Sequence, residues 1–421
     1  MGQFFNNLLQ DINAFLWGLA GYSSQEITTL AEDSWIGYLL AAIIQAALLL
    51  HVLAAGTVLF TWAERKVCGR IQDRLGPTRV GGKFGWLQSI ADGIKLLCKE
   101  DLIPDEADSL LFRIAPYLSI SASFAALIVL PFSDGWVAQQ LNIGAFFILA
   151  IMGLEVFGVI LAGYASGSKW SLYGAMREAA QVISYEIPLA MCVVVPVLLV
   201  GSMNLGTIAN YQAGWFTNWL IFHDPFAFAT FWIYFTCGIA SVNRAPFDLA
   251  EAESELVAGF HTEYSGMRWS LLFMAEYGSM FTVSGLGVLL FLGAWYGPLP
   301  IFNSWTSGTE SWYLAQMANL VGCLNFVLKS SLLVIVMIWV RWTLPRLRID
   351  QVMTMCLKYC VPLSLIGLSG VLLWQLLAIP SLNDLAPARS DLTEHWAEKS
   401  SSPFVKDSQE KVDLFDGRNT Q

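Results

Sequence analysis

Charged residues are scarce in this sequence. They make up 13% of its 421 residues, whereas soluble globular domains carry about 25%. Hydrophobic residues make up 56% of the chain and gather in long blocks. A soluble protein with so little charge would be unable to cover its surface with polar side chains. The composition therefore excludes a large soluble enzyme and favours a membrane protein.

The sequence also lacks the residue patterns of a metal or redox centre. None of its seven cysteines forms a Cys-x-x-Cys pair, and its four histidines are scattered. Cys356 and Cys360 are four residues apart and would share one helix face, but two thiols do not make a metal site. We predict no metal ligands in this chain and structural roles for its cysteines, so any redox centre belongs to another chain.

Basic residues are outnumbered, and the start of the chain has none. The 23 Lys and Arg residues face 33 Asp and Glu residues, which gives a net charge of −10 and argues against nucleic-acid binding. Residues 1–35 contain no Lys or Arg. A secretory signal peptide begins with basic residues, so none is expected here.

Eight apolar blocks are long enough to cross a bilayer, which takes about 20 mostly apolar residues. They lie at residues 35–63, 111–132, 143–165, 183–201, 226–242, 269–293, 320–342 and 359–378. They lack the alternation of a membrane barrel. We predict an all-α integral membrane protein with about eight transmembrane helices over residues 35–378. Residues 1–34 form an N-terminal extramembrane or interfacial segment, and residues 379–421 form a polar C-terminal extension.

Lys and Arg residues occupy alternate loops between these blocks. The loops after the first, third, fifth and seventh blocks contain them, and the loops after the second, fourth and sixth contain none. By the positive-inside rule the basic loops face the cytoplasm, and both termini lie outside. The C-terminal extension also carries basic residues, but terminal segments can cross a membrane regardless of charge.

The first basic loop begins where the first block leaves the membrane, at Glu64, Arg65 and Lys66. It is either part of a site or a basic rim that fixes topology and contacts anionic lipid heads. Residues 86–100 follow, with apolar side chains at the helical spacing of Trp86, Ile90, Ile94 and Leu97. This pattern predicts an interfacial amphipathic helix, which serves either as the lip of an opening for a lipid-soluble substrate or as a membrane anchor.

The loop after the fifth block is unusually acidic. Pro246 is suited to the first turn of a helix, and Asp248, Glu251 and Glu255 would then share one face. Glu253 and Glu263 add to the charge, and no Lys or Arg lies between residues 244 and 268. One interpretation is a solvated acidic loop. Apolar residues between the acids favour docking on the helical bundle, where crowded carboxylates would share protons.

Ionisable residues also fall inside the apolar blocks, where each costs a few kcal/mol. They are Glu155, Glu186, Glu276 and Lys329. Such residues face a bundle interior, a partner charge or water, and Pro188 and Pro196 would open the fourth helix locally to water. The alternative is a paired polar group with a structural role only.

Five segments resemble one known family. Residues 63–77, 86–100, 174–186, 243–266 and 341–351 are similar, in order, to the cytoplasmic loops of the quinone-site membrane subunit, or H subunit, of respiratory complex I, the NADH:quinone oxidoreductase. The string Asn-Arg-Ala-Pro-Phe-Asp-Leu-Ala-Glu-x-Glu-Ser-Glu at 243–255 is long and specific to that family. The resemblance covers residues 35–378 and leaves out both ends of the chain.

The resemblance implies an eight-helix fold at the junction of a membrane arm and a peripheral arm. It implies a chamber for ubiquinone or menaquinone bordered by Glu64, Arg65, Lys66 and Arg70. An acidic path that couples quinone reduction to proton pumping would then comprise Asp248, Glu251, Glu253, Glu255, Glu263, Glu186 and Glu155.

The resemblance also implies what the chain assembles with. Iron–sulfur clusters and FMN would lie only in partner subunits. These partners are an iron–sulfur subunit with the terminal cluster, a large soluble quinone-site subunit, small membrane subunits and antiporter-like subunits. The chain would then be a multi-pass protein of a bacterial inner membrane, in contact with lipid.

Two other functions are compatible with the sequence. One is the equivalent subunit of a related membrane-bound hydrogenase complex. The other is a stand-alone secondary transporter, which would often show an internal repeat that this sequence lacks.

Overall fold

The computed structural model describes residues 35–134, 136–249, 256–298, 312–377 and 379, and every regular element within them is helical. The long helices are α3 (Trp35–Ile71), α5 (Ser109–Val129), α6 (Gly144–Ala165), α7 (Lys169–Val200), α9 (Pro225–Ser241), α11 (Gly266–Phe291), α13 (Trp312–Thr343) and α15 (Val361–Leu376). Shorter helices are η1 (Gly82–Phe84), α4 (Gln88–Cys98), α8 (Leu205–Tyr211), η2 (Phe216–Asn218), η3 (Leu220–Phe222), η4 (Gly259–His261), α14 (Ile349–Thr354) and the π-helical turn η6 (Met355–Cys360).

The predicted all-α membrane fold is confirmed. Among the described residues, seven helical segments are long and apolar enough to cross a membrane, the last of them running from α14 through α15. The eighth, α9, is apolar but has only 17 residues. At 1.5 Å per residue it extends about 25 Å, near the lower limit for a spanning helix. Each predicted block coincides with one of these eight segments.

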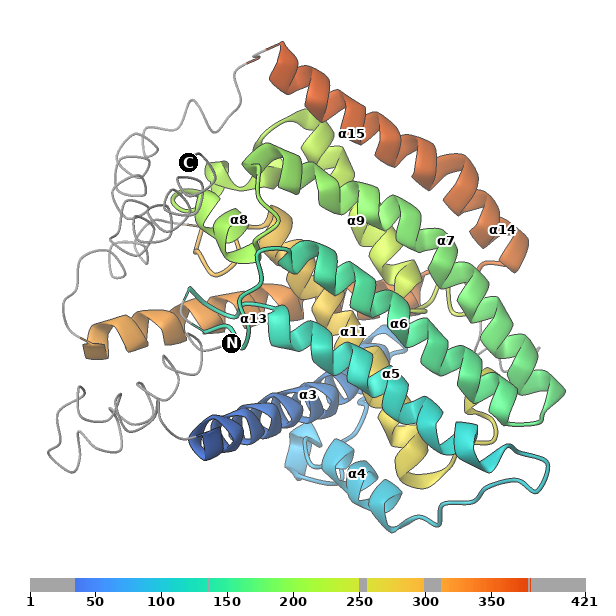
Figure 1. Cartoon of the computed structure of the whole chain (residues 1–421). Helices are drawn as coiled ribbons and strands as arrows, with labels where there is room; N and C mark the ends of the chain where they lie inside the picture. The colour runs from blue at the N-terminus through green and yellow to red at the C-terminus, as the bar shows by residue number, and fades with distance from the viewer. Residues whose placement is uncertain (1–34, 135, 250–255, 299–311, 378, 380–421) are drawn as a thin grey trace, which may run out of the picture.

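The helix α11 forms the centre of the bundle. Figure 1 shows it between α3, α5, α9 and α13, and it is the most buried of the long helices. Beside it, α5 and α6 pack closely because Gly158 lies against Ser119. A Cβ atom at Gly158 would be 2.8 Å from the Ser119 backbone nitrogen. Small residues let membrane helices approach in this way.

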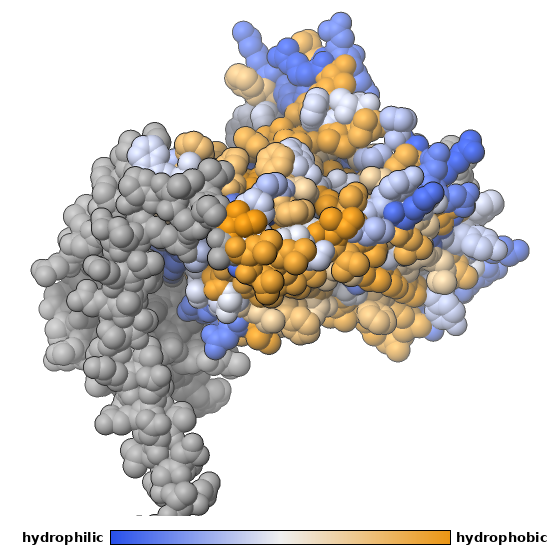
Figure 2. Space-filling view, turned by 90° about the horizontal axis from the view of Figure 1, so that it is seen from above, coloured by the Kyte–Doolittle hydropathy of each residue, from blue (hydrophilic) through white to orange (hydrophobic). Residues whose placement is uncertain are grey.

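Apolar side chains also cover the outside of the bundle. Large hydrophobic residues are exposed along α3, α13 and α15, among them Leu48, Leu328 and Leu373. Figure 2 shows hydrophobic side chains over the middle of one face and hydrophilic residues towards its right-hand end. Such a belt fits contact with lipid tails or with helices of another protein.

The loops with Lys or Arg meet at one end of the bundle, and the loops without them meet at the other. At one, which we call the basic end, Arg268 pairs with Asp101 at 2.9 Å, and the Leu347 N–H donates to the Pro246 carbonyl at 3.0 Å. At the opposite end, the loops contain no Lys or Arg, and Asn210 donates to Asp134 at 3.2 Å. The loops that the sequence assigns to one side therefore do contact one another.

Lys329 is satisfied by backbone near the opposite end. Its ammonium group donates to the carbonyls of Leu292, Ala294 and Tyr296 at 2.7, 3.1 and 2.6 Å. It also lies 4.3 Å from the centre of the Trp219 ring. These carbonyls follow the C-terminus of α11, where a cation is favoured. For Lys329, the interpretation as a paired structural group fits these contacts.

The helix α4 has the amphipathic character that the sequence predicts. Its apolar side chains Ile90, Ile94 and Leu97 are exposed, and Asp92 on the other side pairs with Arg65 of α3. The apolar face thus points away from the bundle, as an interfacial helix requires.

Two local predictions about proline are wrong. Pro246 does not begin a helix, because residues 244–249 form a turn and a short loop that lie against the loop before α14 and bury Phe247 and Leu249. Pro188 and Pro196 do not open α7, which continues through both to Val200. The helix α7 packs against α6 and α9, and neighbouring helices allow a membrane helix to tolerate a proline.

Candidate functional site

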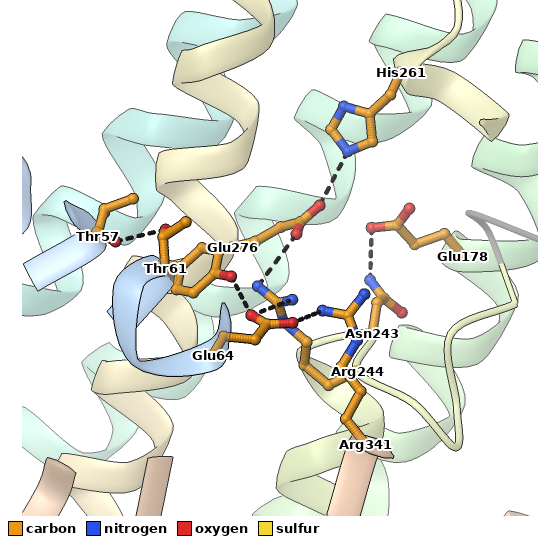
Figure 3. Close-up of polar contacts among 10 residues, drawn as sticks. Thr57, Thr61, Glu64, Glu178, Asn243, Arg244, His261, Glu276 and Arg341 are labelled. Atoms are coloured by element: carbon orange, nitrogen blue, oxygen red, sulfur yellow. Dashed lines mark hydrogen bonds and ion pairs between the residues drawn. The ribbon is translucent and has the colours of Figure 1, made fainter. Parts of the chain in front are cut away.

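Glu64 is the centre of a buried polar network at the basic end. Its carboxylate, on a residue only 8% exposed, accepts hydrogen bonds from the Tyr277 hydroxyl and from Arg341 Nη1, the latter at 2.6 Å. Thr57 and Thr61 precede it on the same face of α3. The helix α3 continues to Ile71, past the end of the apolar block at residue 63. Glu64 therefore lies on the same helix face as the two threonines, and its side chain points towards α11 and α13 (Figure 3).

Arg244 links Glu64 to a second carboxylate. Its Nη1 lies 3.7 Å from Glu64 Oε2, and its Nη2 lies 3.7 Å from Glu276 Oε2. The guanidinium group also lies over the Tyr277 ring, 4.3 Å from its centre. With 6% exposure, Arg244 is a buried cation that both carboxylates compensate.

His261 extends the network on the far side of Glu276. Its Nε2 lies 3.0 Å from Glu276 Oε1, and the ring is buried against Phe260. One hydrogen therefore lies between an imidazole and a carboxylate, two groups that can each bind a proton. The series Arg341, Glu64, Arg244, Glu276 and His261 joins α13, α3, the loop after α9, α11 and η4.

A small cavity adjoins Glu276. Residues of α5, α6, α7, α9, η4 and α11 line it, and among them are Glu155 of α6, Glu178 of α7, and Glu276 and Ser279 of α11. The Ser279 hydroxyl donates to Glu155. The cavity has about 20 Å³ of space for the centres of water molecules, enough for about one. A water there would have several polar partners.

The four residues that were predicted to border a quinone chamber have different surroundings in the structure. Glu64 is in the network. Arg65 pairs with Asp92 of α4, and the Lys66 ammonium donates to the backbone carbonyls of Leu75 and Pro77 at 3.3 and 2.7 Å. Arg70 is exposed. Arg65 and Lys66 thus hold the first loop against the end of α3, while only Glu64 points into the bundle.

Only part of the predicted acidic path lies within the residues that the structure describes. Asp248 is buried and pairs with Arg346 at 3.0 Å, and Glu263 is half-buried. Glu155 lines the cavity. Glu186 is half-buried on α7, where a Cβ atom at Gly153 of α6 would lie 3.0 Å from its Oε1. Glu251, Glu253 and Glu255 lie outside the described residues.

Several residues of the network were not assigned to a site from sequence. Glu276 has the signal that singled out Glu155, an acid inside an apolar block, and this signal could have identified it. Arg244 and Arg341 read as topological charges, and His261 as one of four scattered histidines. Only the fold shows that these side chains converge.

Metal ligands do not gather in the same way. Within the part of the chain that the structure describes, no group of three or more His, Cys, Asp or Glu side chains could hold a metal ion. The absence of a redox centre from the whole chain stays a prediction.

Comparisons with known proteins match most of the chain. The sequence profile of a family described as NADH dehydrogenase matches residues 44–372. The chain is 43% identical over 350 residues to the H subunit of the NADH-quinone oxidoreductase of Anaeromyxobacter dehalogenans, a match that covers 81% of this chain and 84% of the relative. Its identity to the H subunit from Chlorobaculum tepidum is 43% over 343 residues, or 80% and 91% of the two chains. For that of Geobacillus kaustophilus the identity is 46% over 323 residues, or 76% and 90%.

Proposed function

The chain belongs to the NADH dehydrogenase family, and from this premise we propose that it is a membrane subunit of a proton-pumping NADH:quinone oxidoreductase. The observation that carries the proposal is the buried series from Arg341 through Glu64, Arg244 and Glu276 to His261. Burying that many charges is costly even when they are paired, so their presence supports a role in protonation or charge movement.

Quinone binds, in this proposal, where α3 and α4 leave the membrane. The exposed apolar side chains of α4 and the preceding segment suit an isoprenoid tail, and Glu64, Arg65, Lys66 and Arg70 border the chamber for its head. Arg65, Lys66 and Arg70 supply N–H donors of the kind that quinone carbonyls need, and the Glu64 carboxyl can donate only when it is protonated. Partner subunits hold the iron–sulfur clusters and FMN that deliver electrons.

The coupling path begins at the acidic loop and continues into the bundle. It comprises Asp248, Glu251, Glu253, Glu255, Glu263, Glu186 and Glu155, and we add Glu276 and His261 because they connect Glu64 to the cavity. Reduction of quinone to quinol takes up two electrons and two protons. A change of charge beside Glu64 alters its attraction for Arg244, and Arg244 then interacts more or less strongly with Glu276.

The proton on the His261–Glu276 pair responds to that movement. When Arg244 approaches Glu276, the carboxylate is stabilised and the proton favours His261 or the cavity water. When Arg244 turns to Glu64, the proton returns to Glu276. Antiporter-like subunits receive the resulting change in protonation. We place the basic end in the cytoplasm of a bacterium, with the chain in its inner membrane.

Glu64→Gln tests this function in the intact complex. Glutamine can still accept from Tyr277 and Arg341, but it carries no charge. We expect quinone reductase activity to fall about tenfold or more, since positioned acid–base groups contribute that much or more. NADH oxidation by ferricyanide, which bypasses the quinone site, should be unchanged. The exposed carboxylate in Glu106→Gln serves as the control.

The same preparation distinguishes the other functions. A tagged chain that co-purifies with NADH-oxidising iron–sulfur subunits supports the oxidoreductase. Purification with hydrogenase subunits, or as a monomer with transport activity, contradicts it. Normal quinone reduction and pumping in both Glu64→Gln and Glu276→Gln would remove the coupling role of the network.

A further inference from the structure

Glu178 is a buried acid that neither the chamber nor the coupling path includes. It lies on α7 two turns before Glu186 and is 5% exposed. Its Oε1 accepts a hydrogen bond from Asn243 Nδ2 at 2.6 Å (Figure 3). A carboxylate in such a place needs strong compensation to persist, so its position suggests more than packing.

The neighbours of Glu178 hold it in one orientation. Asn243 adopts a left-handed backbone conformation with φ of 51°, which asparagine tolerates better than most residues. The Gln181 amide donates to Asn243 Oδ1 at 2.9 Å and to the Ala240 carbonyl at 2.8 Å. With its oxygen bonded to Gln181, Asn243 has only its N–H₂ group to offer to Glu178. The hydrogen bond from Gln181 therefore fixes which end of the Asn243 amide faces Glu178.

The cavity connects Glu178 to the other carboxylates. Glu178, Glu155 and Glu276 come from α7, α6 and α11, and all three line the same small space. The space is large enough for about one water. Carboxylates around one small cavity repel each other when all are ionised, so the protonation of each depends on the other two.

We propose that Glu178 is a further proton-carrying residue of this subunit and that Asn243 is its positioning residue; this inference rests on the proposed function. A proton leaves the Glu276 carboxyl for the cavity water, and that water passes one of its protons to the Glu178 carboxylate. The water is unchanged, Glu276 becomes ionised and Glu178 becomes neutral. The step links the Arg244 side of the network to α7, which also carries Glu186.

The test uses Glu178→Gln in the assembled complex. Glutamine can accept the Asn243 hydrogen bond through its oxygen, so a purely structural role would survive the change. We expect quinone-linked proton pumping to fall about tenfold, with NADH–ferricyanide activity unchanged. Glu178→Asp, which keeps the acid, should retain part of the pumping. In reduced-minus-oxidised infrared spectra, the carboxyl band of one residue should disappear in Glu178→Gln and shift in Glu178→Asp.

Asn243→Gly tests the positioning role. Glycine tolerates the left-handed backbone and removes the side-chain amide, both the donor to Glu178 and the acceptor for Gln181. We expect the same carboxyl band to move and pumping to fall by less than in Glu178→Gln. An unchanged band would overturn the role of Asn243.

The outcomes separate this inference from the proposed function. Normal pumping and an unchanged carboxyl band in Glu178→Gln, with loss of activity in Glu64→Gln, overturn the role of Glu178 alone. Normal activity in both overturns both proposals. Loss of pumping in Glu178→Gln with an unchanged band makes the residue structural and overturns the inference. If Glu178→Gln fails to assemble, the band of Glu178→Asp decides.

Discussion

Glu64 shows what a buried carboxylate needs from its neighbours. Two arginines and a tyrosine hydroxyl surround it, and Arg341 makes the shorter of the two ion pairs. Desolvation of a carboxylate and a guanidinium costs several kcal/mol, and close contact recovers that cost only while both partners are present. Removing one partner leaves the other charge buried.

Arg341→Gln should therefore destabilise the protein through Glu64. We expect a loss of about 2 kcal/mol, since Arg341 is partly exposed and Arg244 still compensates Glu64. The midpoint of thermal inactivation of the detergent-solubilised complex should fall. Arg348→Gln, at an exposed arginine of the same region, should leave it unchanged. In the double variant Glu64→Gln/Arg341→Gln the losses should be less than additive, and full additivity would contradict the pairing.

Sequence identifies a residue of this site only when its type is out of place. Glu64 at the end of an apolar block and Glu155 within one are such cases. Glu276 shares that signal, whereas Arg244 and His261 lie in a charged loop where any polar residue is expected. Their roles depend on contacts between α3, α11 and the loop after α9, which no local pattern encodes.

Hydropathy predicts the presence of a membrane helix more reliably than it predicts where that helix begins and ends. Every predicted block is a helix, because each backbone polar group in a bilayer needs an internal partner. The helices α3 and α7 nevertheless extend well beyond their blocks into charged sequence, to Ile71 and back to Lys169. Hydropathy marks the part within the membrane, while packing against neighbours decides where the helix ends. The extended part of α3 is what brings Glu64 to the network.

Close packing of α5 on α6 gives a prediction at this scale. The Cβ atom in Gly158→Ala would lie 2.8 Å from the backbone of α5. Backbone atoms cannot move aside as easily as the end of a flexible side chain. We expect the two helices to separate, at a cost of about 2 kcal/mol, with lower thermal stability of the complex. Since α6 carries Glu155, pumping should fall as well.

Gly93→Ala is the matched control for this change. It also places a methyl group on a helix, but nothing lies within 4 Å of the new atom in α4. Alanine should stabilise α4 by about 0.5–1 kcal/mol or leave the complex unchanged. Equal losses in both variants would show that helical glycines matter here for a reason other than packing.

The molecule as a whole has chemically different ends. Loops with Lys and Arg contact one another at the basic end, and those without gather at the opposite end. This arrangement was predictable, because charge in short loops determines orientation during insertion. The convergence of Glu155, Glu178 and Glu276 on one cavity was not, since it depends on the rotation of three helices about their axes.

The natural cysteines allow the orientation to be measured. Cys98, at the end of α4 and near the basic end, is exposed, while Cys68, Cys192, Cys237, Cys356 and Cys360 are buried and Cys323 is half-buried. A membrane-impermeant maleimide should therefore label Cys98 in inside-out vesicles and leave it unlabelled in right-side-out vesicles. A cysteine at exposed Thr207 of the opposite end, in a Cys98→Ser background, should give the reverse pattern. Labelling of both positions from the same side would contradict the odd number of spans between them. Labelling of Cys98 only in right-side-out vesicles would contradict the assignment of the basic end to the cytoplasm. In that second case the quinone site proposed beside Glu64 would lie at the non-cytoplasmic end, away from the NADH-oxidising subunits of the proposed complex.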